Sequence, residues 1–113
     1  MTDYKQGDVI LVPYPFGERA GGKKRPALVV SSFEFNQATG ELIIAQITSN
    51  ASAAPRPGDH RIDGWREANL PRAALVRCRL ATLQSSLVLR RLGALTDPDL
   101  QAALKTLTAA LLG

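Results

Sequence analysis

The chain has 113 residues, 45% hydrophobic and 21% charged, which is typical of one globular domain spanning residues 1–113. Its single cysteine, Cys78, excludes an internal disulfide and a cysteine-based zinc site. The 14 Lys and Arg against 10 Asp and Glu give a net charge of +4, which favours an anionic partner. No apolar run reaches about 18 residues, so no transmembrane helix is expected. The first residues lack a signal-peptide pattern, and we expect a cytoplasmic protein with no membrane contact.

The apolar pattern predicts mostly β-structure, because most hydrophobic runs are short and bounded by Gly, Pro, Asn or Ser. Strands are expected at 9–14, 27–32, 42–48, 60–62, 74–82 and 86–92. Segment 33–39 is expected as a helical turn or loop, and 65–70 as a helical turn before Pro71. Segment 49–58 is rich in Ala, Pro and Ser and is expected as a loop.

The predicted strand 74–82 alternates clearly. Val76, Cys78 and Leu80 would lie on its apolar side, while Arg77 and Arg79 would lie on the other. Cys78 is therefore expected to be a buried structural thiol.

The last segment is the one clear helix. Asp97 is expected to cap its N-terminus and Pro98 to occupy its first position. An apolar stripe follows at helical spacing and suits a core or dimer face: Leu100, Leu104, Leu107 and Leu111. Strands in sequence order with short links favour antiparallel pairing. The predicted fold is mainly β (α+β): a small barrel or strongly twisted antiparallel sheet with a C-terminal helix.

A basic loop ends in Lys-Lys-Arg-Pro-Ala-Leu at 23–28 and leads into a strand, which places Arg25 at a strand entrance. A basic triplet alone is more typical of a solvated loop. The triplet becomes specific only together with other short motifs in the chain: Gly-Asp-Val at 7–9, Arg-Pro-Ala-Leu-Val-Val-Ser at 25–31, Thr-Ser at 48–49 and Val-Arg-Cys at 76–78. In this order the segments resemble the MazF/PemK family of toxin endoribonucleases, from about Gly7 to the end of the chain.

The resemblance implies an SH3-like barrel with a C-terminal helix, assembled as a homodimer. It implies metal-independent, sequence-selective cleavage of single-stranded RNA, such as mRNA, within a type II toxin-antitoxin system. It also implies a cognate antitoxin partner whose acidic, largely disordered segment covers the basic surface. No cofactor is expected. The sequence offers one histidine, His60, and no cluster of carboxylates at metal-ligand spacing. We expect His60 to be an ordinary surface residue.

RNA carries its own nucleophile, the 2′-OH, so cleavage needs a base, stabilisation of charge on the phosphorane and a proton for the 5′-oxygen. By resemblance, Arg25 contacts the scissile phosphate and Thr48 donates a hydrogen bond to it. Arg77 acts as general acid or charge stabiliser. Without the resemblance, Thr48 would be a turn-capping residue and Arg77 part of a solvated strand face.

Four further residues are expected to contact the substrate: Glu18, Lys24, Ser49 and Arg79. Position 79 departs from PemK-like members, which typically carry an Asp there, and arginine cannot act as a base. Glu18 is the nearest matching carboxylate, although it is also typical of a solvated loop. The base is therefore Glu18, a hydroxyl or a water molecule, or the chain cleaves slowly or not at all.

Two alternatives stay open. One is a toxin on the same fold that poisons a DNA topoisomerase by protein contact, as CcdB-like proteins do. Such a protein has no need of the set Arg25, Thr48 and Arg77. The other is a nuclease-dead module that keeps only dimer and antitoxin contacts, for which Arg79 is the best argument.

Overall fold

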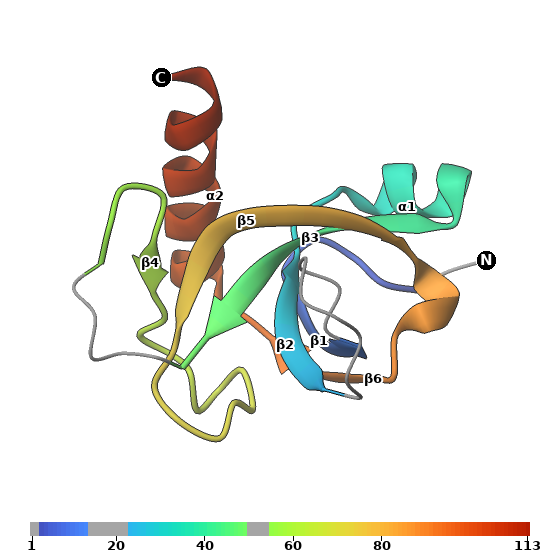
Figure 1. Ribbon diagram of the computed structural model, residues 1–113, viewed down its shortest axis with the longest axis horizontal. Helices are drawn as coiled ribbons and strands as arrows, with labels where there is room; N and C mark the ends of the chain where they lie inside the picture. The colour runs from blue at the N-terminus through green and yellow to red at the C-terminus, as the bar shows by residue number, and fades with distance from the viewer. Residues whose placement is uncertain (1–2, 14–22, 50–54) are drawn as a thin grey trace.

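The structure is a computed structural model that describes residues 3–13, 23–49 and 55–113. Its described strands form one antiparallel sheet in the order β4-β5-β3-β2-β1-β6. The elements are β1 (Asp8–Pro13), β2 (Lys24–Val29), α1 (Phe33–Thr39), β3 (Glu41–Thr48), β4 (His60–Arg61), β5 (Leu75–Gln84), the 3-10 turn η1 (Ser85–Leu87), β6 (Arg90–Ala94) and α2 (Asp97–Leu112). Figure 1 shows β5 arching over the curled sheet, with α2 beside β4. The mainly β fold with a C-terminal helix is confirmed.

Strand β2 begins at Lys24, three residues before the predicted start, so Arg25 lies within the strand rather than at its entrance. Pro26 is tolerated there because it pairs with Leu11 of β1, whereas pairing with β3 begins only at Ala27. The missing N–H of Pro26 therefore leaves the β2–β3 ladder intact.

The strand predicted at 86–92 is wrong in its first half. The chain first makes η1, where the N–H of Val88 donates to the carbonyl of Ser85, and β6 follows at Arg90–Ala94. Leu89 N–H then donates to the carbonyl of Leu11 at 2.8 Å, which directs the segment along β1. The apolar run at 87–89 therefore predicted the right type of element but not its start.

Both helices have defined caps. In α1 the hydroxyl of Ser32 accepts from Phe35 N–H at 3.1 Å, and Gly40 ends the helix at φ +71°. In α2 the N-cap is Thr96, not Asp97, so the predicted cap is off by one residue and Pro98 occupies the first turn.

Two apolar clusters form the core. The first joins the sheet to α2 and to the segment before β5: Val9, Leu28, Ala45, Ile47, Ile62, Ala68, Leu70, Ala74, Val76, Leu95, Ala103 and Leu107. The second is formed by side chains on the other face of β1, β2, β3 and β5: Ile10, Val12, Ala27, Val29, Leu42, Ile44 and Leu83. The alternation of each central strand therefore supplies both clusters, and β2 and β3 are buried on both faces.

The predicted leucine stripe of α2 is buried unevenly. Leu107 is buried, Leu100 and Leu104 are half-buried, and Leu111 is 63% exposed. Within the described ranges, no helix is long and apolar enough to cross a membrane.

Candidate functional site

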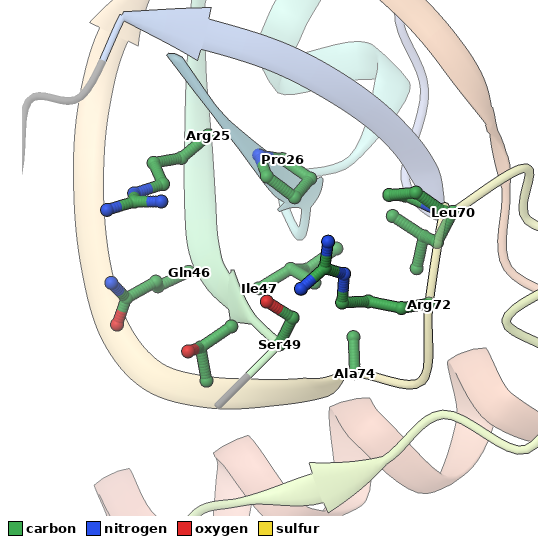
Figure 2. A pocket seen from close by; sticks show the side chains of 10 residues that line it. Arg25, Pro26, Gln46, Ile47, Ser49, Leu70, Arg72 and Ala74 are labelled. Carbon is green, nitrogen blue, oxygen red and sulfur yellow. The ribbon is translucent and has the colours of Figure 1, made fainter. Parts of the chain in front are cut away.

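An open pocket of about 530 Å³ lies where β2 and β3 meet the segment before β5. Its lining residues are Arg25, Pro26, Gln46, Ile47, Thr48, Ser49, Leu70, Pro71, Arg72 and Ala74. Figure 2 shows the guanidinium of Arg25 and the amide of Gln46 on one side of β3, and the guanidinium of Arg72 on the other side beside Pro26 and Ile47. The pocket thus combines two cationic groups, an amide and two hydroxyls.

Strand alternation positions the polar groups on β2 and β3. Arg25 precedes Ala27 by two residues on β2, and Thr48 follows Gln46 and Ile44 at the same spacing on β3. Ala27 and Ile44 belong to the second apolar cluster, so the polar side chains continue the face that this cluster buries. Arg25 is exposed and Thr48 half-buried, as a site open to a ligand requires.

The structure brings together three of the residues singled out from sequence: Arg25, Thr48 and Ser49 all line the pocket. Lys24 is exposed beside Arg25 on β2 but is not among the lining residues. Glu18 lies outside the described residues.

Arg77 is placed beside the pocket rather than in it. It is the register partner of Gln46, so its side chain starts on the same face of the sheet. Its guanidinium is bound by the carboxylate of Asp59: Nε donates to Oδ1 at 3.1 Å and Nη2 to Oδ2 at 2.9 Å. The Asp59 side chain is fully enclosed and that of Arg77 is 18% exposed.

This ion pair shifts both groups. Burial by itself raises the pKa of Asp59, but the hydrogen bonds from Arg77 and from the N–H of Arg56, together with their positive charge, bring it below its ordinary value. The hydrogen bond to Asp59 raises the pKa of Arg77. Arg77 is therefore a permanently charged, well-held cation, and it is not the solvated strand residue that alternation alone predicts.

A bulge separates Arg77 from Arg79. Gln46 is opposite Arg77, but the next residue of β3, Ala45, is opposite Leu80. Cys78 and Arg79 therefore have no register partner on β3, so the ladder is interrupted there, while Val76 and Cys78 still pack on one face of the sheet and Ala81 and Leu83 on the other. Cys78 is half-buried against the first apolar cluster, and Arg79 is exposed.

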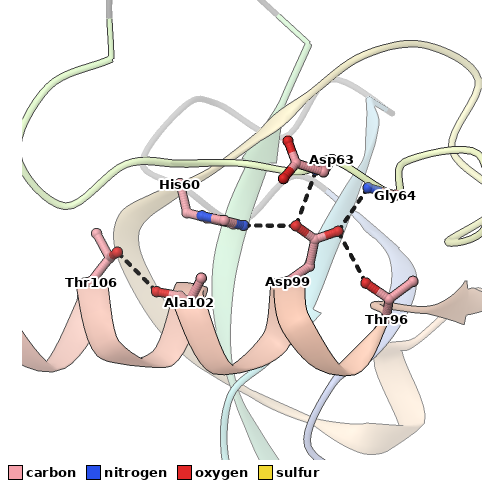
Figure 3. A network of polar contacts seen from close by, with 7 residues as sticks. All are labelled: His60, Asp63, Gly64, Thr96, Asp99, Ala102 and Thr106. Atoms are coloured by element: carbon pink, nitrogen blue, oxygen red, sulfur yellow. Dashed lines mark hydrogen bonds and ion pairs between the residues drawn. The ribbon is translucent and has the colours of Figure 1, made fainter.

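His60 differs from its expected role as an ordinary surface residue. Its Nε2 lies 2.9 Å from Oδ1 of Asp99, whose side chain is only 3% exposed (Figure 3). Asp99 also accepts from the N–H of Asp63 at 3.0 Å, the N–H of Gly64 at 2.8 Å and the hydroxyl of Thr96 at 3.3 Å.

These donors decide the charge state of Asp99. Its burial raises the pKa, but the N–H of Gly64, the imidazole of His60 and the N–H of Asp63 more than compensate, and the pKa falls below its ordinary value. The network ties the β4 segment to the first turn of α2 and is a structural use of the one histidine. In the part of the chain that the structure describes, no three His, Cys, Asp or Glu residues gather where they could hold a metal ion.

Residues 5–111 match the family model described as PemK-like, MazF-like toxin of type II toxin-antitoxin system. The chain belongs to this toxin family. No curated protein sequence matches the chain. The resemblance read from the motifs at 7–9, 25–31, 48–49 and 76–78 is thereby confirmed.

Solved structures of the toxin family share the fold. An endoribonuclease in complex with its cognate antitoxin from a mycobacterial species has a TM-score of 0.76 at 19% identity, covering 96% of this chain and 94% of that one. A MazE-MazF complex from Deinococcus radiodurans has a TM-score of 0.74 at 22% identity, covering 97% and 98%. The Mycobacterium tuberculosis toxin MazF-mt6 has a TM-score of 0.73 at 16% identity, covering 92% and 95%.

Proposed function

We propose that this toxin-family chain is an endoribonuclease that cleaves single-stranded RNA, with sequence selectivity and without a metal ion, at the pocket formed by β2 and β3. The observation that carries the proposal is the convergence of the Arg25 guanidinium with the hydroxyls of Thr48 and Ser49 in one open pocket. A guanidinium and hydroxyl donors suit a phosphodiester, because they offer positive charge and hydrogen bonds to its oxygens.

In the proposed reaction, the 2′-oxygen of the RNA attacks the adjacent phosphorus, a P–O bond forms, and the bond to the 5′-oxygen breaks. Arg25 supplies positive charge to the phosphorane and Thr48 donates a hydrogen bond to the same group. The products are a 2′,3′-cyclic phosphate and a 5′-hydroxyl. The proton leaves the 2′-oxygen and a proton reaches the 5′-oxygen, so no external reactant is consumed.

Arg77 is proposed to stabilise charge from the edge of the pocket, beside Gln46. Asp59 occupies Nε and one N–H of Nη2, and the guanidinium keeps three further N–H donors. Lys24, Ser49 and Arg79 are proposed to bind the RNA strand, since Ser49 lines the pocket and the two cations are exposed on β2 and β5, the strands on either side of β3.

No described carboxylate lines the pocket, so the base is not assigned among the described residues. Glu18, a hydroxyl and a water molecule remain the candidates. Two features also support a second candidate, a nuclease-dead member that keeps only binding. Position 79 carries an arginine instead of an Asp, and Arg77 is already paired with Asp59. RNA that is bound but never cleaved would favour that reading.

The toxin is proposed to act as a homodimer in the cytoplasm and to be held inactive by a cognate antitoxin with an acidic segment. The support is the net charge of +4 and the neighbouring structures described as complexes with a cognate antitoxin. An acidic segment would compete with RNA for the same cationic groups.

The test of the proposed site is Arg25→Ala. We expect its single-turnover cleavage of RNA to fall by about 2 to 4 kcal/mol of barrier, the scale for one preorganised donor. The unfolding temperature should change little, because Arg25 is exposed. Arg61→Ala is the matched control, since Arg61 is an exposed strand arginine that does not line the pocket. Equal cleavage by Arg25→Ala and the parent would remove Arg25 from the site.

A further inference from the structure

Arg72 enters the pocket from a segment that the sequence motifs do not mark. It lies between the turn that ends near Leu70 and the start of β5 at Leu75. Figure 2 shows its guanidinium directed into the pocket, beside Pro26 and Ile47. From the sequence, Arg72 is only one of several arginines that contribute to the positive charge.

The segment that carries Arg72 is anchored at both ends. Leu70 is 6% exposed and its N–H donates to the carbonyl of Trp65 at 3.0 Å. Ala74 is 8% exposed and its carbonyl accepts from Ile62 N–H at 3.0 Å. Pro71 restricts the backbone between them. The position of Arg72 is thus set by buried neighbours, and its exposed side chain is not needed to hold the segment in place.

Three other arginines of the described chain have partners that account for them. Arg77 is bound to Asp59, the Nε of Arg91 lies 3.1 Å from Oδ1 of Asp8, and Arg66 lies over the Trp65 ring at 4.4 Å from its centroid. Among the described residues, Arg72 has no ion-pair or hydrogen-bond partner. A guanidinium that faces a pocket of hydroxyls without a carboxylate is available for an anion that enters.

We propose that Arg72 binds a second phosphate of the RNA, next along the strand from the scissile phosphate held by Arg25 and Thr48. The two guanidiniums lie on opposite sides of β3 in Figure 2, so they suit two phosphates of one strand rather than one shared phosphate. Arg72 then fixes the position of the strand and contributes affinity, while Arg25 acts on the reacting group. This proposal rests on the proposed function.

The test measures binding apart from cleavage. The probe is a single-stranded RNA with 2′-fluoro groups at every position, which lacks the nucleophile. Arg72→Ala should weaken its binding about tenfold, the scale of one lost charged hydrogen-bonding contact. The slope of log affinity against log salt should fall by about 0.7, as expected for one phosphate contact with a single strand.

Two variants serve as controls for this measurement. Arg72→Lys should keep the salt slope of the parent but not its full affinity, because lysine keeps the charge and loses the planar fork. Arg66→Ala should bind as the parent does, because Arg66 is an exposed arginine of the neighbouring turn that lies outside the pocket lining. Unchanged unfolding temperatures in all three variants confirm that binding is the property altered.

Single-turnover cleavage of ordinary RNA at saturation separates the two arginines. Arg72→Ala should then lose much less of its cleavage rate than Arg25→Ala does, because Arg72 binds the strand and Arg25 acts on the reacting group. A loss equal to that of Arg25→Ala would overturn the proposal and place Arg72 at the scissile phosphate. Binding equal to that of the parent at all salt concentrations would also overturn it. If Arg72→Ala binds an acidic antitoxin peptide more weakly than the parent but binds the RNA as the parent does, Arg72 contacts a protein partner, and the proposal is again overturned.

Failure of the proposed function gives a different result. A parent protein that binds the 2′-fluoro RNA through Arg72 but leaves ordinary RNA intact would refute the endoribonuclease and support the second phosphate contact.

Discussion

Asp59 is enclosed although Arg56 and Pro57, just before it, are exposed. Its carboxylate accepts two hydrogen bonds from Arg77 and one from the N–H of Arg56 at 3.0 Å. An enclosed charge is stable only when such partners surround it, and removing one partner of a buried pair costs more than the pair itself contributes. Arg77 is therefore held in one orientation next to the pocket.

Replacing Asp59 with Asn should lower the free energy of unfolding at pH 7 by about 1 to 3 kcal/mol, because the amide keeps the shape but leaves Arg77 without its counter-charge. The measurement is denaturant unfolding. Asp63→Asn is the control, since Asp63 is exposed and its side chain makes no hydrogen bond or ion pair with a described residue. A loss no larger than that of the control would show that the ion pair contributes nothing.

The difference in unfolding free energy between the parent and Asp59→Asn should change with pH in one direction only. The lowered pKa of Asp59 means that its stabilising contribution is complete above the ordinary aspartate pKa, about 3.9, and is lost as the pH falls through the lowered value. The stability difference between parent and Asp59→Asn should therefore be constant near neutral pH and shrink below about pH 4. A difference that grew toward acid pH would contradict the pKa direction.

At the residue scale, sequence and resemblance find Arg25, Thr48 and Ser49 because short motifs mark the ends of β2 and β3. They do not find Arg72, since its segment has no motif and only the packing of Leu70 and Ala74 directs it to the pocket. The Arg77–Asp59 pair joins residues 18 apart in the chain, and the His60–Asp99 contact joins residues 39 apart. Such pairs follow from tertiary structure and leave no local pattern.

A tight turn before β4 positions Asp59 beside Arg77. The N–H of Asp59 donates to the carbonyl of Arg56 at 2.9 Å, with Pro57 second and Gly58 third at φ +93°, the pattern of a type II β-turn. A Cβ at Gly58 would lie 2.9 Å from the Cβ of Cys78. Both the backbone conformation and the neighbouring strand therefore require glycine.

Comparing Gly58→Ala with Gly40→Ala separates the two requirements. Gly40 also has a positive φ, +71°, but nothing lies within 4 Å of an added Cβ. Gly40→Ala should cost about 1 kcal/mol, the penalty of the left-handed conformation alone. Gly58→Ala should cost about 1 to 3 kcal/mol more, the scale of overpacking. Equal losses in thermal unfolding would mean that the contact with Cys78 is relieved without strain.

At the element scale, apolar patterning predicts β1, β3 and β5 within a few residues because each has buried residues along its length. The segment after β5 was predicted wrongly in part, since 86–92 contains an apolar run typical of a strand but begins in η1 and joins β6 only at Arg90. The bulge in β5 is also invisible in the sequence, because pairing with β3 decides it and Cys78 and Arg79 fit an unbroken strand equally well.

The whole molecule leaves several large apolar side chains exposed: Leu80, Leu87, Leu89, Leu111 and Leu112, at 39%, 51%, 48%, 63% and 82%. A second copy of the chain would remove such surface from water, as the proposed homodimer implies. Sedimentation at micromolar concentration should give about twice the chain mass of 12.1 kDa. A single species of one chain mass at the highest soluble concentration would rule out the homodimer.

The fold as a whole was predictable in class, because composition, strand spacing and the C-terminal helix agree with each other and with the toxin family. The pairing order β4-β5-β3-β2-β1-β6 is set by long-range contacts, notably the return of β6 to β1. The pocket arises from this order, since β2 and β3 become neighbours and the segment before β5 closes its far side. The sequence motifs identify residues with suitable side chains, and the strand order brings these residues together in the pocket.

Metal-independent RNA cleavage at the pocket of Arg25 and Thr48 can be tested in a single experiment. Purified protein is incubated with a long single-stranded RNA in excess EDTA, in parallel with Arg25→Ala, and the new ends are analysed. We expect cleavage by the parent at a limited set of sites, with 2′,3′-cyclic phosphate and 5′-hydroxyl ends, and a large loss of cleavage in Arg25→Ala. Intact RNA with the parent, or cleavage that needs a divalent metal, would contradict it.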